Sequence, residues 1–118
     1  MTALTVTLPW PDRRLWPNQA QYRHWRSREE PRDAAIAIGW ALGRELGVTL
    51  PSEPTPIEYV FHGPTRRKYD LEGAHGACKH YIDGLARALE VDDFYFEPAT
   101  QRRGEPVKGG CVEIRIGQ

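Results

Sequence analysis

Carboxylates stand at both ends of one predicted helix. Asp70 and Glu72 flank Leu71 at its start, and Asp92 and Asp93 follow its end. Hydrolysis of a phosphodiester commonly uses a hard divalent cation that polarises the phosphate and lowers the pKa of a bound water. Magnesium suits this task because it binds carboxylate oxygens and keeps several of its waters. Converging carboxylates would predict a magnesium site, whereas acidic residues at helix ends are also typical of caps and solvated surfaces.

A lysine follows the first two carboxylates at a helical spacing. Lys79 lies two turns after Glu72, so both would project from nearly the same face of a regular helix, and Asp83 falls one turn further along. Such a lysine could contact the scissile phosphate or stabilise the leaving oxygen. A plain surface ion pair between Lys79 and Asp83 is the alternative. His75 and His80 lie close by and are interpreted as bystanders, although His75 could reach a metal.

The hydrophobic pattern predicts the elements that position these residues. Period-two alternation of apolar residues predicts strands, and spacings of three and four residues predict helices. The predicted elements are strands at residues 2–8, 57–61, 94–100 and 111–116, and helices at residues 28–46 and 74–89. Their order predicts a single α/β (α+β) domain of βαβαββ order, with a mixed four-stranded sheet and two main helices.

Turn and cap residues mark the ends of these elements. Ser27 and Glu30 can form a capping box at the start of the first helix, and Gly47 supplies its stop. Gly73 and Gly76 weaken the first turns of the second helix, so its start is expected to be irregular. The glycine-containing loop between the last two strands predicts a β-hairpin.

The composition is that of a small folded protein. A chain of 118 residues with 40% hydrophobic residues predicts one domain and excludes global disorder. An enzyme of this size is expected to clamp a large substrate at its surface or to complete its site by dimerising. Cys78 and Cys111 fit neither a metal-ligand spacing nor a disulfide framework, so they are interpreted as reduced core residues. The chain shows no export signal and no membrane-spanning run, which predicts a cytoplasmic protein.

The charges balance in number but not in position. The chain has 16 basic and 16 acidic residues, and the acids concentrate between Asp83 and Glu97. Segregated basic segments and one acidic cluster could hold phosphates at the rim and a divalent cation at the centre. Solvated loops without a partner are the plainer alternative. The basic groups are Arg13, Arg14, Arg23, Arg26, Arg28 and Arg32, then Arg66, Arg67 and Lys68, then Arg102, Arg103 and Lys108.

Several short motifs occur in a specific order along most of the chain. An N-terminal strand ends in LPW, and Asn18 and the segment YRHWRSRE follow. The second strand leads into GPTRRKYDLEG, then K-x3-DGL (Lys79, Asp83, Gly84, Leu85), then VDD at residues 91–93. No single motif is specific, but together they resemble the RusA family of Holliday-junction resolvases. The resemblance is strongest to the short RusA-like proteins of actinobacteria and their phages.

This resemblance implies a homodimeric α/β endonuclease that uses Mg2+, with Mn2+ able to substitute, to make paired cuts across a four-way DNA junction. The implied metal-binding carboxylates are Asp70, Glu72 and Asp93, with Asp92 as a helper, and the implied catalytic lysine is Lys79. The implied contacts to backbone phosphates are Arg66, Arg67, Lys68, Arg23, Arg26 and Arg28. Asn18 and Trp25 would lie near the junction centre, where an aromatic ring could stack on an unpaired base, although packing also explains Trp25.

Two positions depart from the family's DxDN pattern. Glu72 replaces the second Asp, which keeps the charge, and Gly73 replaces the Asn, which removes an expected hydrogen bond behind the metal ligands. Loss of such a bond can cost one or two orders of magnitude in activity. A junction-binding protein of the same fold with weakened catalysis is therefore the first alternative. An unrelated α/β interaction protein, whose acids are only helix-end residues, is the second.

Overall fold

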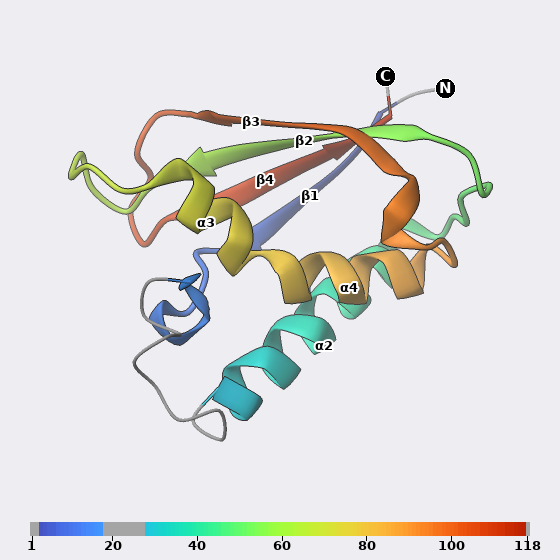
Figure 1. Ribbon diagram of the computed structural model, residues 1–118, viewed down its shortest axis with the longest axis horizontal. Coiled ribbons are helices and arrows are strands. Elements are labelled where there is room, and N and C mark those ends of the chain that lie inside the picture. The colour runs from blue at the N-terminus through green and yellow to red at the C-terminus, as the bar shows by residue number, and fades with distance from the viewer. Residues whose placement is uncertain (1–2, 18–27, 118) are drawn as a thin grey trace.

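The computed structural model describes residues 3–17 and 28–117, and it arranges them as a sheet with helices on one side (Figure 1). The βαβαββ order and the mixed four-stranded α/β sheet are confirmed. The second predicted helix is divided in two, so residues 3–17 and 28–117 include three α-helices. The elements are β1 (Leu4–Pro9), η1 (Arg13–Leu15), α2 (Glu29–Leu46), β2 (Thr55–His62), α3 (Leu71–Ala77), α4 (Lys79–Ala88), η3 (Asp93–Tyr95), β3 (Phe96–Arg103) and β4 (Cys111–Ile116).

The strand order in the sheet is β1-β4-β2-β3. β4 pairs antiparallel with both β1 and β2, whereas β2 and β3 are parallel and connected through the helices. The predicted hairpin between the last two strands is therefore wrong. The helical crossover places β3 on one side of β2, so β4 can pair with β2 only from the other side, where β1 completes the sheet.

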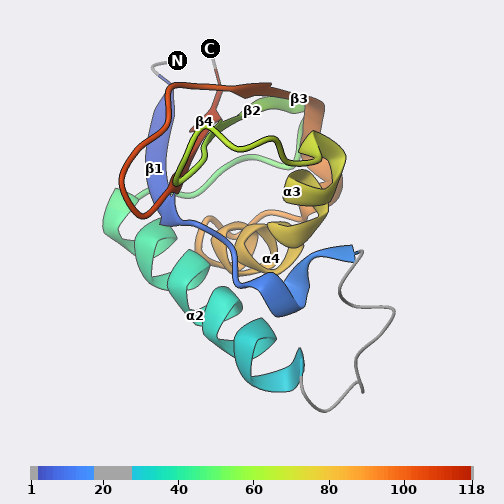
Figure 2. The ribbon, with the colours of Figure 1, turned by 90° about the vertical axis from the view of Figure 1, so that its left-hand side faces the viewer.

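The core lies between the sheet and the helices. Alternate residues of each strand point to this side, which is why Ile57, Tyr59 and Phe61 on β2 and Ile114 on β4 are buried. Figure 2 shows α3 and α4 beneath the sheet and α2 packed along the far side of α4. β3 forms one edge of the sheet, and most of its residues after Phe96 are exposed.

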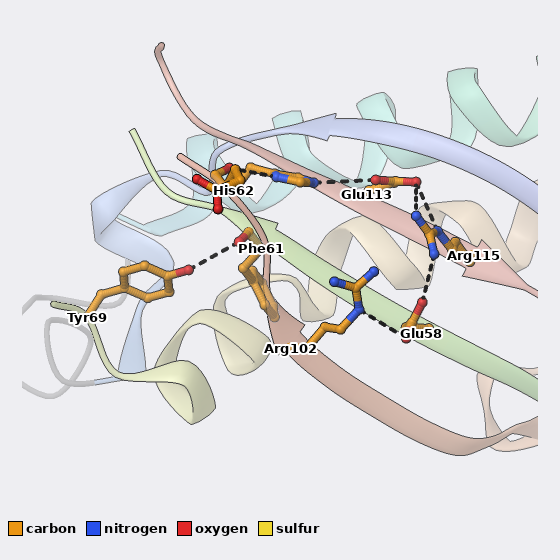
Figure 3. A network of polar contacts seen from close by, with 8 residues as sticks. Glu58, Phe61, His62, Tyr69, Arg102, Glu113 and Arg115 are labelled. Carbon is orange, nitrogen blue, oxygen red and sulfur yellow. Dashed lines mark hydrogen bonds and ion pairs between the residues drawn. The ribbon is translucent and has the colours of Figure 1, made fainter. Parts of the chain in front are cut away.

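The opposite face of the sheet carries a chain of charged side chains (Figure 3). Arg115 lies 2.9 Å from Glu113 and 3.3 Å from Glu58, and Arg102 lies 3.5 Å from the second oxygen of Glu58. The His62 ring completes the series, 3.4 Å from Glu113. Polar residues on this face and apolar residues on the other are the pattern of a sheet covered by helices on one side only.

The two predicted helices differ in how closely they match expectation. α2 ends at Gly47, as predicted, with a left-handed φ of 66°. Ser27 lies outside the described residues, and Arg28 holds the cap position without a side-chain cap bond. The predicted second helix breaks at Cys78, where α3 ends and α4 begins. The regular-helix spacing expected between Glu72 and Lys79 therefore does not hold.

Both cysteines are free thiols, as predicted, but only Cys78 is a core residue, and Cys111 is half-buried. Burial raises the pKa of Cys78 to about 12. Among residues 3–17 and 28–117, every helix is too short or too polar to cross a membrane.

Candidate functional site

The chain reverses direction after α4 and brings an acidic group together. Glu90 adopts a left-handed φ of 56°, and Asp92 then caps η3 by accepting a hydrogen bond of 2.8 Å from the Phe94 backbone N–H. Asp83, Asp92 and Asp93 line an open depression of about 300 Å³ on this side of α4. Three carboxylates from two elements thus face one shallow, solvent-accessible hollow.

Asp93 is a carboxylate of this group whose pKa is raised by its surroundings. Its pKa is raised first by partial burial, then by contact with the Asp92 side chain, then by the negative charges of Asp83 and Asp92. The positive charge of Lys79 acts in the opposite direction. Adjacent carboxylates that repel one another are stabilised by positive charge, which Arg87 in the same depression or a bound cation would supply.

Lys79 reaches this acidic group through Asp83. Its Nζ lies 3.5 Å from Asp83 Oδ2, and His80 Nδ1 lies 3.4 Å from the same oxygen. Burial lowers the pKa of His80, while the contact with Asp83 raises it by a smaller amount. The ion pair foreseen as the plain alternative for Lys79 is therefore present. The Lys79 side chain stays 68% exposed in this pair, so its ammonium group is accessible from solvent.

The first two predicted metal ligands lie elsewhere, at the start of α3. Asp70 is its N-cap, and its two carboxylate oxygens accept hydrogen bonds from the backbone N–H groups of Glu72 (3.3 Å) and Gly73 (3.1 Å). Glu72 is exposed on the first turn. The β2–helix–β3 crossover explains the separation, since α3 and the end of α4 lie toward opposite ends of the helical layer (Figure 1).

Gly73 is one of the two residues that depart from the DxDN pattern of the RusA family, and it is buried against the Asp70 carboxylate. A Cβ at this position would lie 3.1 Å from Asp70 Oδ2 and 3.3 Å from the Trp16 ring. A larger residue here would press on both groups. The local packing at the start of α3 therefore accounts for a glycine in this chain.

The donor set of the α4–η3 depression fits a hydrated magnesium ion better than an enclosed one. In the described parts of the chain, no three His, Cys, Asp or Glu residues form a group that could hold a metal among themselves. Magnesium often takes only one or two carboxylates and fills its other positions with waters and substrate phosphate oxygens. Asp92 and Asp93, in mutual contact, can supply such a pair.

His75 and Gln101 form a contact that the sequence did not indicate. His75 Nδ1 lies 2.6 Å from Gln101 Oε1, within hydrogen-bond distance, and the imidazole lies 4.3 Å from the Tyr59 ring. Burial, with smaller effects from Cys78, Asp93 and Asp83, raises the pKa of Tyr59 far above its ordinary value. His75 thus holds α3 against the sheet through Gln101 on β3. The sequence could not predict this contact, because the two residues are 26 positions apart.

The predicted DNA-contacting residues are only partly within the described chain. Arg66, Arg67 and Lys68 form an exposed turn after β2. Arg28 lies at the start of α2 and is half-buried. The predicted residues Asn18, Arg23 and Arg26, and also Trp25, lie outside the described residues. Arg103 belongs to a different basic group of the sequence, but in the structure it lines the same hollow as the Arg66–Lys68 turn.

The comparison with known proteins gives a relative that aligns along nearly the whole chain. No known protein family's sequence profile matches the chain. An uncharacterized protein of Xylella fastidiosa (strain Temecula1 / ATCC 700964) is 33% identical over 116 aligned residues, covering 95% of this chain and 74% of that protein. The similarity therefore extends over nearly the whole α/β domain rather than over one motif.

Proposed function

We propose that this chain, which belongs to the same protein family as the Xylella fastidiosa protein, is a magnesium-dependent endodeoxyribonuclease that resolves four-way DNA junctions by paired phosphodiester hydrolysis. The observation that carries the proposal is the acidic group of Asp83, Asp92 and Asp93 with Lys79 beside it. The order of motifs, which resembles that of the RusA family, supplies the substrate class. A cationic turn on the same domain supplies contacts for the DNA backbone.

The side chains have distinct parts in this proposal. Asp92 and Asp93 would hold Mg2+, which when bound polarises a phosphate oxygen and lowers the pKa of a water. Asp83 anchors the Lys79 ammonium at 3.5 Å, and from there the ammonium can stabilise the negative charge that develops on the leaving oxygen. Asp70 and Glu72 stay predicted ligands through the family resemblance, with Asp70 also capping α3.

A homodimer belongs to the same proposal. A four-way junction has two-fold symmetry, so paired cuts at symmetric positions need two equivalent sites. A two-fold dimer of a chain with one site supplies both. Light scattering at micromolar concentration should therefore give twice the monomer mass, and a purely monomeric protein would contradict the paired-cut mechanism.

A synthetic four-way junction tests the activity directly. With Mg2+ or Mn2+, the wild-type protein should convert the junction into two nicked duplexes and leave a linear duplex of the same sequence intact. Asp93→Asn should abolish the cutting, because it removes a negative charge from the cation site. Glu97→Gln, which changes the charge of an exposed residue on β3, is the matched control and should cut normally.

A junction-binding protein with weakened catalysis is the second candidate. The separation of Asp70 and Glu72 from Asp93 favours it, because the three predicted ligands do not form one group in the described chain. In that case the wild-type protein binds the junction in gel-shift experiments but leaves it uncut with either metal. That result would reject the enzyme and retain the binding function.

A further inference from the structure

We propose that a cationic hollow at the C-terminal ends of β2 and β3 binds a single phosphate group of a nucleic-acid backbone, with Arg103 as its anchoring residue. The hollow has a volume of about 200 Å³. This inference rests on the proposed function for the identity of its ligand, since the phosphate belongs to a DNA strand. The side chains that define it are Arg66, Arg67, Lys68, Tyr69 and Arg103, with the backbone of Gly104.

Strand topology brings these residues together. β2 and β3 are parallel, and the register pairs Phe61 near the end of β2 with Arg103 at the end of β3. The turn that follows β2 and the last residue of β3 therefore meet at one edge of the sheet, although Lys68 and Arg103 are far apart in sequence. Two of the three basic groups in the sequence thus contribute to one hollow.

Arg103 is held in place before any ligand arrives. One of its terminal nitrogens donates a 2.7 Å hydrogen bond to the Tyr69 carbonyl oxygen, and its guanidinium carbon lies 5.1 Å from the centre of the Tyr69 ring. Tyr69 is itself fixed, because its hydroxyl donates to the Phe61 carbonyl at 3.2 Å (Figure 3) and its ring packs edge-on against Trp10. A fixed planar guanidinium keeps further N–H donors for a phosphate and loses little conformational freedom on binding.

The charge of the hollow is not neutralised from within the described chain. Arg66 forms an ion pair with Glu105 at 3.8 Å. This pair is weak, because both side chains are more than 80% exposed. No ion pair among residues 3–17 and 28–117 involves Arg67, Lys68 or Arg103. An anion with several acceptor oxygens complements this surface.

The neighbouring arginine provides a matched control within the same strand. Successive strand residues point to opposite faces, and Arg102 accordingly extends over the open face, 3.5 Å from Glu58 (Figure 3). Arg102→Gln and Arg103→Gln remove the same charge from adjacent positions. Only the second should affect the hollow.

The binding test uses a short fluorescent single-stranded oligonucleotide in EDTA, with anisotropy measured from about 50 to about 200 mM salt. Arg103→Gln should weaken binding about tenfold at the lower salt, and should reduce the salt dependence by about one phosphate contact. Arg102→Gln should match the wild type, and Arg103→Lys should recover part of the loss. Equal binding by both glutamine variants would overturn the inference.

A second measurement needs no variant and separates the possible sources of phosphate. Inorganic phosphate and a thymidine dinucleotide are titrated separately into isotopically labelled wild-type protein, and the side-chain N–H signals of Arg102 and Arg103 are followed by NMR. The dinucleotide should shift the Arg103 signal and leave Arg102 unchanged. A shift with inorganic phosphate alone would overturn the assignment to a nucleic-acid backbone. A dinucleotide shift in a protein that leaves junctions uncut would retain the hollow and reject only the nuclease.

Discussion

Gly84 on α4 lies directly against the backbone of Ile36 on α2, with no space for a side chain between them. A Cβ at Gly84 would overlap the Ile36 carbonyl oxygen, and Gly39 on α2 meets the Tyr81 carbonyl in the same way. The two helices therefore cross at backbone contact. This contact gives the glycine of the DGL motif a packing role that is independent of catalysis.

Gly84→Ala should destabilise the domain by about 2 kcal/mol, the upper end of the usual overpacking cost less the gain in helix propensity. Overpacking of this kind usually costs 1–3 kcal/mol, and here the added methyl meets rigid backbone rather than a flexible side chain. The gain in helix propensity offsets only about 1 kcal/mol. Urea unfolding measures the difference. Gly76→Ala, at an exposed position of α3 next to the Pro17 ring, is the control and should change stability by less than about 1 kcal/mol.

The capping role of Asp70 can be separated from its predicted role as a metal ligand. Asparagine is as good an N-cap as aspartate, so Asp70→Asn should leave thermal stability nearly unchanged. Asp70→Ala should cost about 1 kcal/mol, because the N–H groups of Glu72 and Gly73 lose their acceptor. Calorimetry compares the two variants. If Asp70→Asn unfolds at as low a temperature as Asp70→Ala, the negative charge of Asp70 contributes to stability, and capping alone does not explain the loss.

Lys79→Gln should separate catalysis from folding. The Lys79–Asp83 pair is largely exposed on the lysine side, so its loss should change the free energy of unfolding by less than about 1 kcal/mol. Junction cutting should fall by about a hundredfold, in line with removal of one group that stabilises developing charge. Lys108→Gln, which removes an exposed lysine from the β3–β4 loop, should leave the rate unchanged. Full activity of the Lys79 variant would assign this lysine to the surface pair alone.

The open face of the sheet should make stability depend on pH in the acid range. The hydrogen bond from Arg115, helped by His62, lowers the pKa of Glu113 below its ordinary value of 4.5. A carboxylate with a lowered pKa in the folded state stabilises the protein above its unfolded pKa. That contribution is lost as the pH falls below about 4.5 through the folded pKa.

Glu113→Gln removes this dependence and should cost about 1 kcal/mol at neutral pH, where the charged hydrogen bond is present. Below the folded pKa of Glu113 the variant and the wild type should converge. Urea unfolding between pH 3 and pH 7 (roughly the interval over which such carboxylates titrate) measures the two curves. Parallel curves would show that Glu113 does not contribute to the pH dependence of stability. Glu45→Gln, at an exposed position of α2, controls for the change in net charge.

Local patterns in the sequence were enough to predict the elements that local interactions determine. The alternation of Ile57, Tyr59 and Phe61 predicted β2, and the glycine at position 47 predicted the end of α2. The order of the strands was not predictable in the same way. β4 enters the sheet between β1 and β2, and that placement depends on pairing between residues that are far apart in sequence, such as Tyr59 with Ile114 and Val6 with Ile114.

In the candidate site too, local features could be predicted from the sequence, whereas long-range contacts could not. Asp92 and Asp93 were predicted from their types and position, but their approach to Asp83 depends on the reversal at Glu90. Arg103 could not be joined to the Arg66–Lys68 turn without the parallel pairing of β2 and β3. The break at Cys78 also escaped prediction, because the apolar stripe continues through it and periodicity alone does not detect a change in helix axis.

The exposed edge strand β3 restricts how two copies of this chain can associate. An open sheet edge is a template on which another strand can add. Pro98 removes one backbone donor from this edge, and the exposed charged side chains of Arg102 and Arg103 disfavour the addition of another strand. The two sheets of a dimer are therefore not expected to join into one continuous sheet through β3.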